Sequence, residues 1–139
     1  MAIFTLTDAT VIVNGVTLSD HSNSVTVEDS RDPVDITAFG ATNKAFTKGL
    51  GDGKMTVQFF QDFASGKTHA TLQPLIGSTT GVTIELRATS AARSATNPAA
   101  LMTGLLMNYS MLAGGIGEAS TITAEFQHSS QAGITYPTS

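Results

Sequence analysis

Alternation of apolar and polar residues predicts most of the elements in this chain. The run from Lys54 to Phe59 places Met55, Val57 and Phe59 on one side of a strand and polar residues on the other. Further strand-like runs cover residues 10–13, 16–18, 24–28, 34–37, 82–87, 101–111 and 120–127. The chain is therefore expected to be mainly β.

One short helix interrupts the strands. Apolar residues recur at helical spacing after Thr68, which is a suitable N-cap, and Gly77 is a suitable end. Pro74 keeps this helix short or bent. The apolar sets of the strands and the helix predict a core of Val25, Val27, Met55, Val57, Phe59, Leu72, Leu75, Val82, Ile84, Leu86, Ile122 and Phe126.

Turn residues divide the strands. Asn14-Gly15 predicts a type I′ hairpin, and Asp32-Pro33 predicts a bulge in one longer strand. The segment from Phe39 to Gly53 has no clear period and is predicted to be a long loop. It mixes glycines with Phe46 and Leu50, so we expect a partner rather than its own domain to order it.

The order of several short strings resembles the major tail (tail tube) proteins of long-tailed bacteriophages. These strings are Val13-Asn14-Gly15-Val16-Thr17-Leu18-Ser19-Asp20-His21, Val34-Asp35-Ile36-Thr37-Ala38-Phe39-Gly40, Phe59-Phe60-Gln61-Asp62-Phe63, Leu72-Gln73-Pro74-Leu75-Ile76-Gly77 and Ser94-Ala95-Thr96-Asn97-Pro98. The resemblance runs from about Val11 to Gln127 and involves no catalytic signature. It implies a β-sandwich or half-barrel tail-tube fold with one short α-helix and a long strand-connecting loop.

The resemblance also implies how the chain works. Residues 1–128 are expected to form a single tail-tube-like domain and residues 129–139 a flexible C-terminal tail. Copies are expected to assemble as hexameric rings that stack into a tube, and DNA would pass through it without specific binding. The implied partners are other copies and the tape measure, terminator and distal tail proteins, in a virion assembled in the bacterial host cytoplasm.

Two sets of residues are candidates for these roles. The long loop supplies candidate inter-ring contacts, which are Phe39, Lys44, Phe46, Lys48 and Leu50. The polar side of the closing strand, with one residue of an earlier strand, supplies candidate lumen-facing positions, which are Glu85, Thr121, Thr123, Glu125 and Gln127. A hydroxyl-rich and acidic wall there is expected to repel the DNA backbone.

Composition agrees with an assembly subunit. The chain has 139 residues, which suits one domain, but only 13% of them are charged and the formal net charge is −4. So few charges indicate that part of the surface is buried between copies. Seven basic against eleven acidic residues disfavour a nucleic-acid-binding stripe. We expect no secretory signal and no membrane anchor.

The candidate chemistry is weak, so we expect no enzyme, metal or cofactor. Adjacent residues such as Asp20-His21-Ser22 cannot form a catalytic relay among themselves. There is no cysteine, and the three histidines lie far apart. Asp29, Asp32 and Asp35 surround Arg31, which favours salt bridging over a cation site.

Other functions fit the pattern less well. A tail terminator, or the tube of a contractile tail or injection device, shares the expected fold. A carbohydrate-binding β-sandwich is the alternative from another class. Sugar platforms need exposed aromatic residues, whereas this chain has no tryptophan and only Tyr109 and Tyr136 as tyrosines.

Overall fold

The structure is a computed structural model that describes residue 3 and residues 5–139. Met1, Ala2 and Phe4, which begin the predicted domain 1–128, lie outside the described residues. The elements are β1 (Thr10–Val13), β2 (Val16–Thr17), η1 (Ser19–His21), β3 (Ser22–Asp35), β4 (Phe46–Phe60), α1 (Thr68–Ile76), β5 (Val82–Arg87), β6 (Ala99–Tyr109) and β7 (Thr121–His128).

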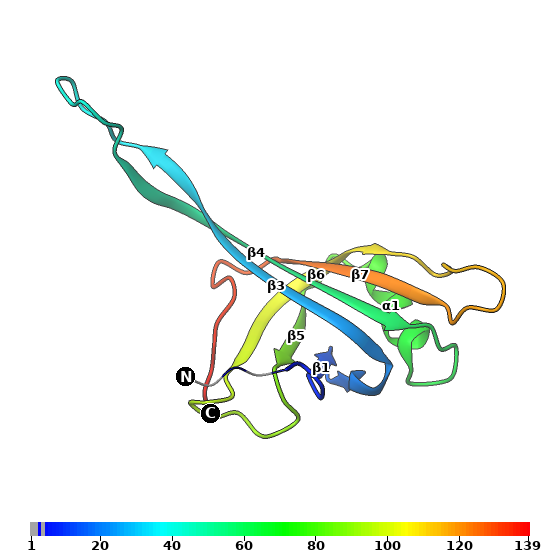
Figure 1. Ribbon diagram of the computed structural model, residues 1–139. Coiled ribbons are helices and arrows are strands. Elements are labelled where there is room, and N and C mark those ends of the chain that lie inside the picture. Colours follow the sequence, from blue (N-terminus) through cyan, green and yellow to red (C-terminus); the bar gives the residue numbers. More distant parts are fainter. Residues whose placement is uncertain (1–2, 4) are drawn as a thin grey trace.

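The strands form one seven-stranded sheet in the order β2-β1-β5-β6-β7-β4-β3, and all pairs are antiparallel. Val11 of β1 and Val25 of β3 line the same hollow, although β1 and β3 lie toward opposite edges of the sheet. The sheet is therefore strongly curved. Helix α1 packs beside β6 (Figure 1). The predicted fold class, mainly β with one helix, is confirmed, and its architecture is a half-barrel made from one sheet rather than two packed sheets.

The core lies on the inner side of this curled sheet. Met55, Val57, Phe59 and Phe126 are fully buried, and Ile122 is 1% exposed. The other predicted residues with less than a tenth of their surface exposed are Leu72, Leu75, Ile84 and Leu86. The structure adds Val11, Val13, Leu18, Met102, Leu106, Ala124 and Ile134.

Three predicted core positions are less buried than expected. Val25 and Val82 are only partly buried against the core. Val27 was predicted to be buried, and this is wrong, since it is 37% exposed. Its side chain shares the face of its strand partner Met55. However, β3 is an edge strand, so no further strand covers Val27.

The long connection predicted from Phe39 to Gly53 is mostly a strand. β3 and β4 continue as one antiparallel pair from Ser22↔Phe59 to Asp35↔Phe46, and only residues 36–45 join them. The outer part of this pair projects from the body as a long hairpin (Figure 1). The predicted bulge is confirmed by a register shift between Arg31 and Pro33. We call residues 31–51 the arm.

Two local signals had the expected effect, and one did not. Asn14 and Gly15 have φ of 52° and 80°, as a type I′ hairpin requires. Gly77 ends α1 as predicted, whereas Lys67, not Thr68, occupies the N-cap position. The Thr68 hydroxyl instead donates to the Phe60 carbonyl and is fully buried. Thr68 therefore ties the helix to the end of β4.

The C-terminal segment, predicted to be a flexible tail, has specific contacts in the structure. Thr135 exchanges two backbone hydrogen bonds with Leu101 of β6, and Ala99 donates to the Pro137 carbonyl. Ile134 is 7% exposed and belongs to the core. The segment therefore pairs with the first part of β6, beyond the point where β7 ends. The sequence of this polar segment, with Gly133 and Pro137, has no apolar period that would predict these contacts.

Candidate assembly surfaces

The polar face of the sheet brings the candidate lumen residues together. On β7, Ile122, Ala124 and Phe126 enter the core. The alternating residues of that strand therefore lie on the opposite face. Gln127 pairs with Leu105 of β6, and Glu85 pairs with Leu101 of the same strand. Leu101 and Leu105 are an even number of residues apart, so these two leucines and their partners lie on the same face of the sheet. All five candidates, Glu85, Thr121, Thr123, Glu125 and Gln127, therefore share one face.

This face is less acidic than the sequence indicated, because its carboxylates are paired. Glu125 Oε1 lies 3.4 Å from Lys54 Nζ on the neighbouring strand. Glu85 is only 8% exposed and contacts the guanidinium groups of Arg87 and Arg93. The hydrogen bond to Glu85 raises the pKa of Arg93. The negative charge on this face is thus largely compensated. The uncharged polar groups of the face are the hydroxyls of Thr121 and Thr123 and the amide of Gln127.

The arm carries the candidate inter-ring residues, and they are exposed. Phe39 is fully exposed at its tip, Leu50 is 84% exposed and Phe46 is 56% exposed. Lys44 and Lys48 are exposed as well. A two-stranded ribbon with exposed aromatic residues has no core of its own, and such a ribbon is marginally stable in water.

Three glycines of β4, at positions 49, 51 and 53, mark close contacts rather than loop flexibility. A Cβ on Gly49 would lie 2.9 Å from Val34 Cγ2, and one on Gly53 would lie 2.8 Å from Ile134 Cδ1. Gly51 faces the Arg31 side chain in the same way. The glycines at 49, 51 and 53 follow the period of 2 that a strand requires. Apolar periodicity does not show this strand, because glycines occupy the alternate positions.

The root of the arm meets the C-terminal segment around a cavity of about 700 Å³. The Tyr136 hydroxyl donates to Asp29 Oδ2 at 2.9 Å, and Arg31 donates to Asp29 Oδ1. The hydrogen bonds from Arg31 and Tyr136 lower the pKa of Asp29. Burial, together with the bond to Asp29, raises the pKa of Tyr136. The predicted salt bridging of Arg31 within this acidic cluster is thus present at Asp29.

A polar network organises the opposite end of the body. Gln61 donates its backbone N–H to Ser120 O at 2.9 Å and its side-chain amide to Met111 O at 2.6 Å and Tyr109 Oη at 2.9 Å. Tyr109 Oη also lies 2.7 Å from His69 Nδ1. These bonds join the turn after β4 to the β6–β7 connection. The tyrosine is half-buried and engaged, so it offers no open sugar platform.

His21 joins η1 to the same turn. Its Nδ1 lies 2.9 Å from Asp20 Oδ1 and its Nε2 lies 2.8 Å from Asp62 Oδ2. Carboxylates only accept hydrogen bonds, so this geometry fits the imidazolium form, in which both ring nitrogens donate. The bonds to Asp20 and Asp62 raise the pKa of His21. Ser22 donates to the Leu18 carbonyl instead, so these residues form an electrostatic clamp and not a catalytic triad.

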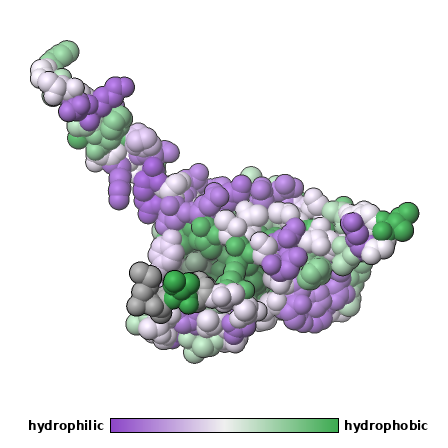
Figure 2. Space-filling model, in the orientation of Figure 1, coloured by the Kyte–Doolittle hydropathy of each residue, from purple (hydrophilic) through white to green (hydrophobic). Residues whose placement is uncertain are grey.

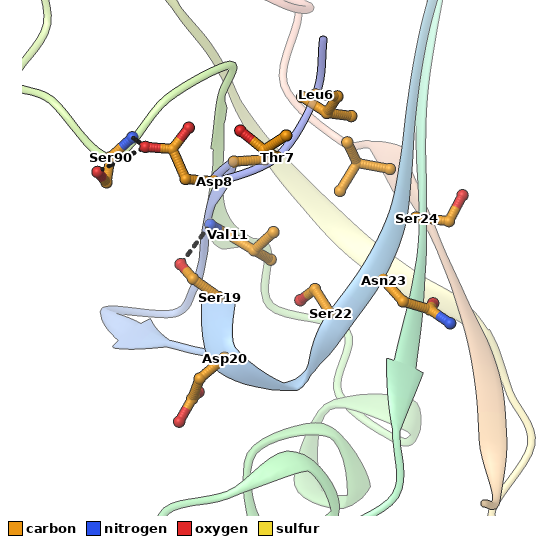
Figure 3. Close-up of a pocket in the computed structure, with 12 residues that line it drawn as sticks. Leu6, Thr7, Asp8, Val11, Ser19, Asp20, Ser22, Asn23, Ser24 and Ser90 are labelled. Carbon is orange, nitrogen blue, oxygen red and sulfur yellow. Dashed lines mark hydrogen bonds between the residues drawn. The ribbon is translucent and has the colours of Figure 1, made fainter.

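The half-barrel is open between the N-terminal segment and β3. Figure 2 shows a hollow there with hydrophobic residues on its floor. Figure 3 shows Leu6 and Val11 on one side and the start of β3 on the other, around a cavity of about 360 Å³. The Ser19 hydroxyl binds the Val11 N–H, and Asp8 binds Ser90. The N-terminal segment with β1 and the start of the edge strand β3 therefore lie on either side of the hollow.

Within the part of the chain that the structure describes, no cluster of side chains is suited to hold a metal ion. In the same part, no helix is long and apolar enough to cross a bilayer.

Comparisons with known proteins identify the fold. No protein-family model and no curated protein matches the sequence. Solved structures do match. A chain of the virion of a native gene transfer agent particle is 7% identical, with 94% of this chain and 95% of that chain covered and a TM-score of 0.73.

Two further structures give the same result. The tail of an empty gene transfer agent particle, with C6 symmetry, matches over 84% of this chain and 82% of its own, at 7% identity and a TM-score of 0.62. The sheath-tube complex of an extracellular contractile injection system, PVC, in its extended state matches over 95% and 89%, at 12% identity and a TM-score of 0.68. The chain therefore shares its fold with a chain of each of these particles and complexes, which confirms the resemblance at the level of fold.

Proposed function

We propose that this chain is the structural, non-catalytic subunit of a phage-type tail tube, a hollow stack of rings through which DNA is delivered. The observation that carries the proposal is the fold shared with a gene transfer agent virion over 94% of this chain and 95% of that one. The low charge content fits a surface that assembly covers.

In this proposal six copies form each ring, in line with the C6 symmetry of the gene transfer agent tail. The edge strands β2 and β3 pair with neighbouring copies, so the half-barrels join into one continuous wall. Edge pairing explains how β3, an edge strand of 14 residues, avoids uncontrolled aggregation. The polar face with Thr121, Thr123 and Gln127 then lines the lumen.

Such a wall suits passing DNA. Its charged groups, including Glu125 with Lys54 and Glu85 with two arginines, are paired within one copy. Glu85 holds both arginines, whose side chains are only 17% and 27% exposed, so the wall offers the phosphate backbone few free cations. The tube would meet tape measure, terminator and distal tail proteins along its length and at its ends, in a virion assembled in the host cytoplasm.

The arm serves in this proposal as the contact between rings. Phe39, Phe46 and Leu50 are exposed apolar residues on a projecting ribbon, and Lys44 and Lys48 add charge near them. A partner that buries these aromatic residues would supply the core that the ribbon lacks.

The tube of a contractile tail or injection device is a second candidate, and the likeness to the PVC sheath-tube complex favours it. A tail terminator shares the fold but caps a tube instead of extending it. Continuous growth of the purified chain would favour either kind of tube over a terminator.

Electron microscopy of the purified protein, with sedimentation velocity on the same sample, tests the proposal. We expect hollow rings and stacked tubes together with species of about six chains or multiples of six. A chain that stays monomeric at the highest attainable concentration would contradict the proposal. Single rings that never stack would instead favour the terminator.

A further inference from the structure

The end of the body opposite the arm carries an unusual concentration of exposed apolar residues. Ile116 is fully exposed, Leu112 is 70% exposed and Phe63 is 55% exposed. With Phe60 and Met111, at 39% and 48%, they form what we call the distal surface. The β6–β7 connection projects there, away from the arm, and hydrophobic atoms cover its tip (Figures 1 and 2). Several large apolar side chains exposed at one end of a molecule point to an interaction site there.

Hydrogen bonds hold the distal surface in shape. Gln61 links its two segments through Met111 O and Ser120 O. The Ser120 hydroxyl closes the loop by donating to Ala113 O at 2.8 Å. Gly114 and Gly117 have positive φ, as tight turns in this loop require. The apolar side chains are thus presented by a built loop before any partner arrives, which reduces the entropy cost of binding.

The two ends of the molecule are complementary in charge. The arm tip, residues 36–48, contains Lys44 and Lys48 and no acidic residue. The β6–β7 loop, residues 110–120, contains Glu118 and no basic residue. Both segments also expose large apolar side chains. Contact between two arm tips would oppose lysines, and contact between two distal loops would oppose glutamates.

We propose that the distal surface of one copy is the docking site for the arm tip of another copy. This inference rests on the proposed function and names the contact that joins successive rings. The two patches lie at opposite ends of one chain (Figure 1), so the contact is heterologous and propagates instead of closing into a dimer. Phe39 and Phe46 supply the apolar anchors, and Lys44 and Lys48 lie toward Glu118.

Cross-linking tests the contact directly, since the chain has no native cysteine. Phe39→Cys and Ile116→Cys are introduced into separate chains of different tag length, which are mixed and treated with a short bismaleimide. We expect a product that contains one chain of each kind. The control pairs Phe39→Cys with Ala95→Cys, another exposed loop position, and should cross-link about tenfold less, the ratio that corresponds to 1.4 kcal/mol of preference.

A charge exchange provides a second, independent measurement. Glu118→Lys places like charges against the arm tip and should weaken stacking about tenfold. The variant Lys44→Glu with Lys48→Glu should do the same, and the combination of all three changes should recover most of the loss. Circular dichroism checks folding, and these exposed sites leave the core untouched.

The outcomes separate this inference from the proposed function. Normal tubes without the Phe39–Ile116 product, or without charge rescue, overturn the docking site and leave the tube intact. Cross-linking and rescue in filaments that lack a lumen support the docking site and contradict the tube. A chain that neither assembles nor cross-links contradicts both.

Discussion

Strands β3 and β4 run through both the body and the arm, yet their side chains have different contacts in the two regions. Near its C-terminal end, β4 buries Met55, Val57 and Phe59 completely, whereas its first residue, Phe46, is 56% exposed. The backbone pairing with β3 runs through both parts. Pairing alone therefore does not make a core, and the arm is an element whose apolar residues await another molecule.

Truncation of two phenylalanines on one strand measures this difference. Phe59→Ala removes a fully buried ring and should lower the free energy of unfolding by about 3–5 kcal/mol. Phe46→Ala, the matched control on the arm, should change it by less than about 0.5 kcal/mol. Urea unfolding of the two variants gives both values. Similar losses at the two positions would mean that the arm is part of the body's core.

Two glycines on the same strand sharpen the boundary between body and arm. A Cβ at Gly53 would press on buried Ile134, so Gly53→Ala should cost about 1–3 kcal/mol by overpacking. A Cβ at Gly51 would meet the exposed Arg31 side chain, which is held by surface hydrogen bonds to Asp29 and Ser30 and can shift more easily than a buried side chain. We therefore expect Gly51→Ala to change stability by less than about 0.5 kcal/mol. Urea unfolding gives both values, and an equal loss of stability in the two variants would mean that the boundary between body and arm does not lie between residues 51 and 53.

The charged clamp at His21 gives the stability of the body a pH dependence near neutrality, which the arm lacks because residues 31–51 contain no histidine. The raised pKa of His21 stabilises the folded state below the unfolded value of about 6.5, and this contribution is lost as pH rises through the raised value. The lowered pKa values of Asp20 and Asp62 contribute above about 3.8 and are lost as pH falls further. The clamp should thus be strongest between about pH 4 and 6.5.

Unfolding of wild type and His21→Gln at pH 5.5 and pH 9 tests this window. Glutamine cannot carry the imidazolium charge, so the variant should lose more stability at pH 5.5 than at pH 9. The same substitution in an Asp20→Asn, Asp62→Asn background is the control and should show no such difference. A loss that is equal at both pH values would contradict the ionic clamp.

Removal of the arm should have little effect on the stability of the body and a large effect on assembly. Ser30 and Asp52 are strand partners, so residues 31–51 can be replaced by Asn-Gly, which suits a two-residue hairpin turn. Nearly all of the removed side chains are exposed, and the free energy of unfolding should change by less than about 1 kcal/mol. Urea unfolding and electron microscopy are the measurements. A folded, armless protein that still forms normal tubes would exclude the arm as the inter-ring contact.

The sequence predicted the body well and the arm poorly, for one physical reason. Period-2 patterns arise where one face of a strand is buried, so residues 54–59, 82–87 and 120–127 were recognised. The arm has no buried face in one copy, and its strand signal lay in the spacing of Gly49, Gly51 and Gly53.

Long-range contacts set the other limit on prediction. The polar face of β7 followed from alternation, but the pairing of Glu85 with Arg93 depends on how the 88–98 loop folds back. The distal surface depends on Gln61 reaching Met111, which lies 50 positions along the chain. No local pattern carries such information.

The orientation of the polar face in an assembly is the central claim, and cryo-electron microscopy of assembled protein tests it most directly. The account predicts a continuous β wall around a central channel, with Thr123 and Glu125 on the channel side. Glu125→Lys should then preserve the tube but place a ring of cations on the DNA path, with delivery impaired and partly restored by salt. A map that places Thr123 and Glu125 on the outer surface, or an assembly without a channel, would contradict the account.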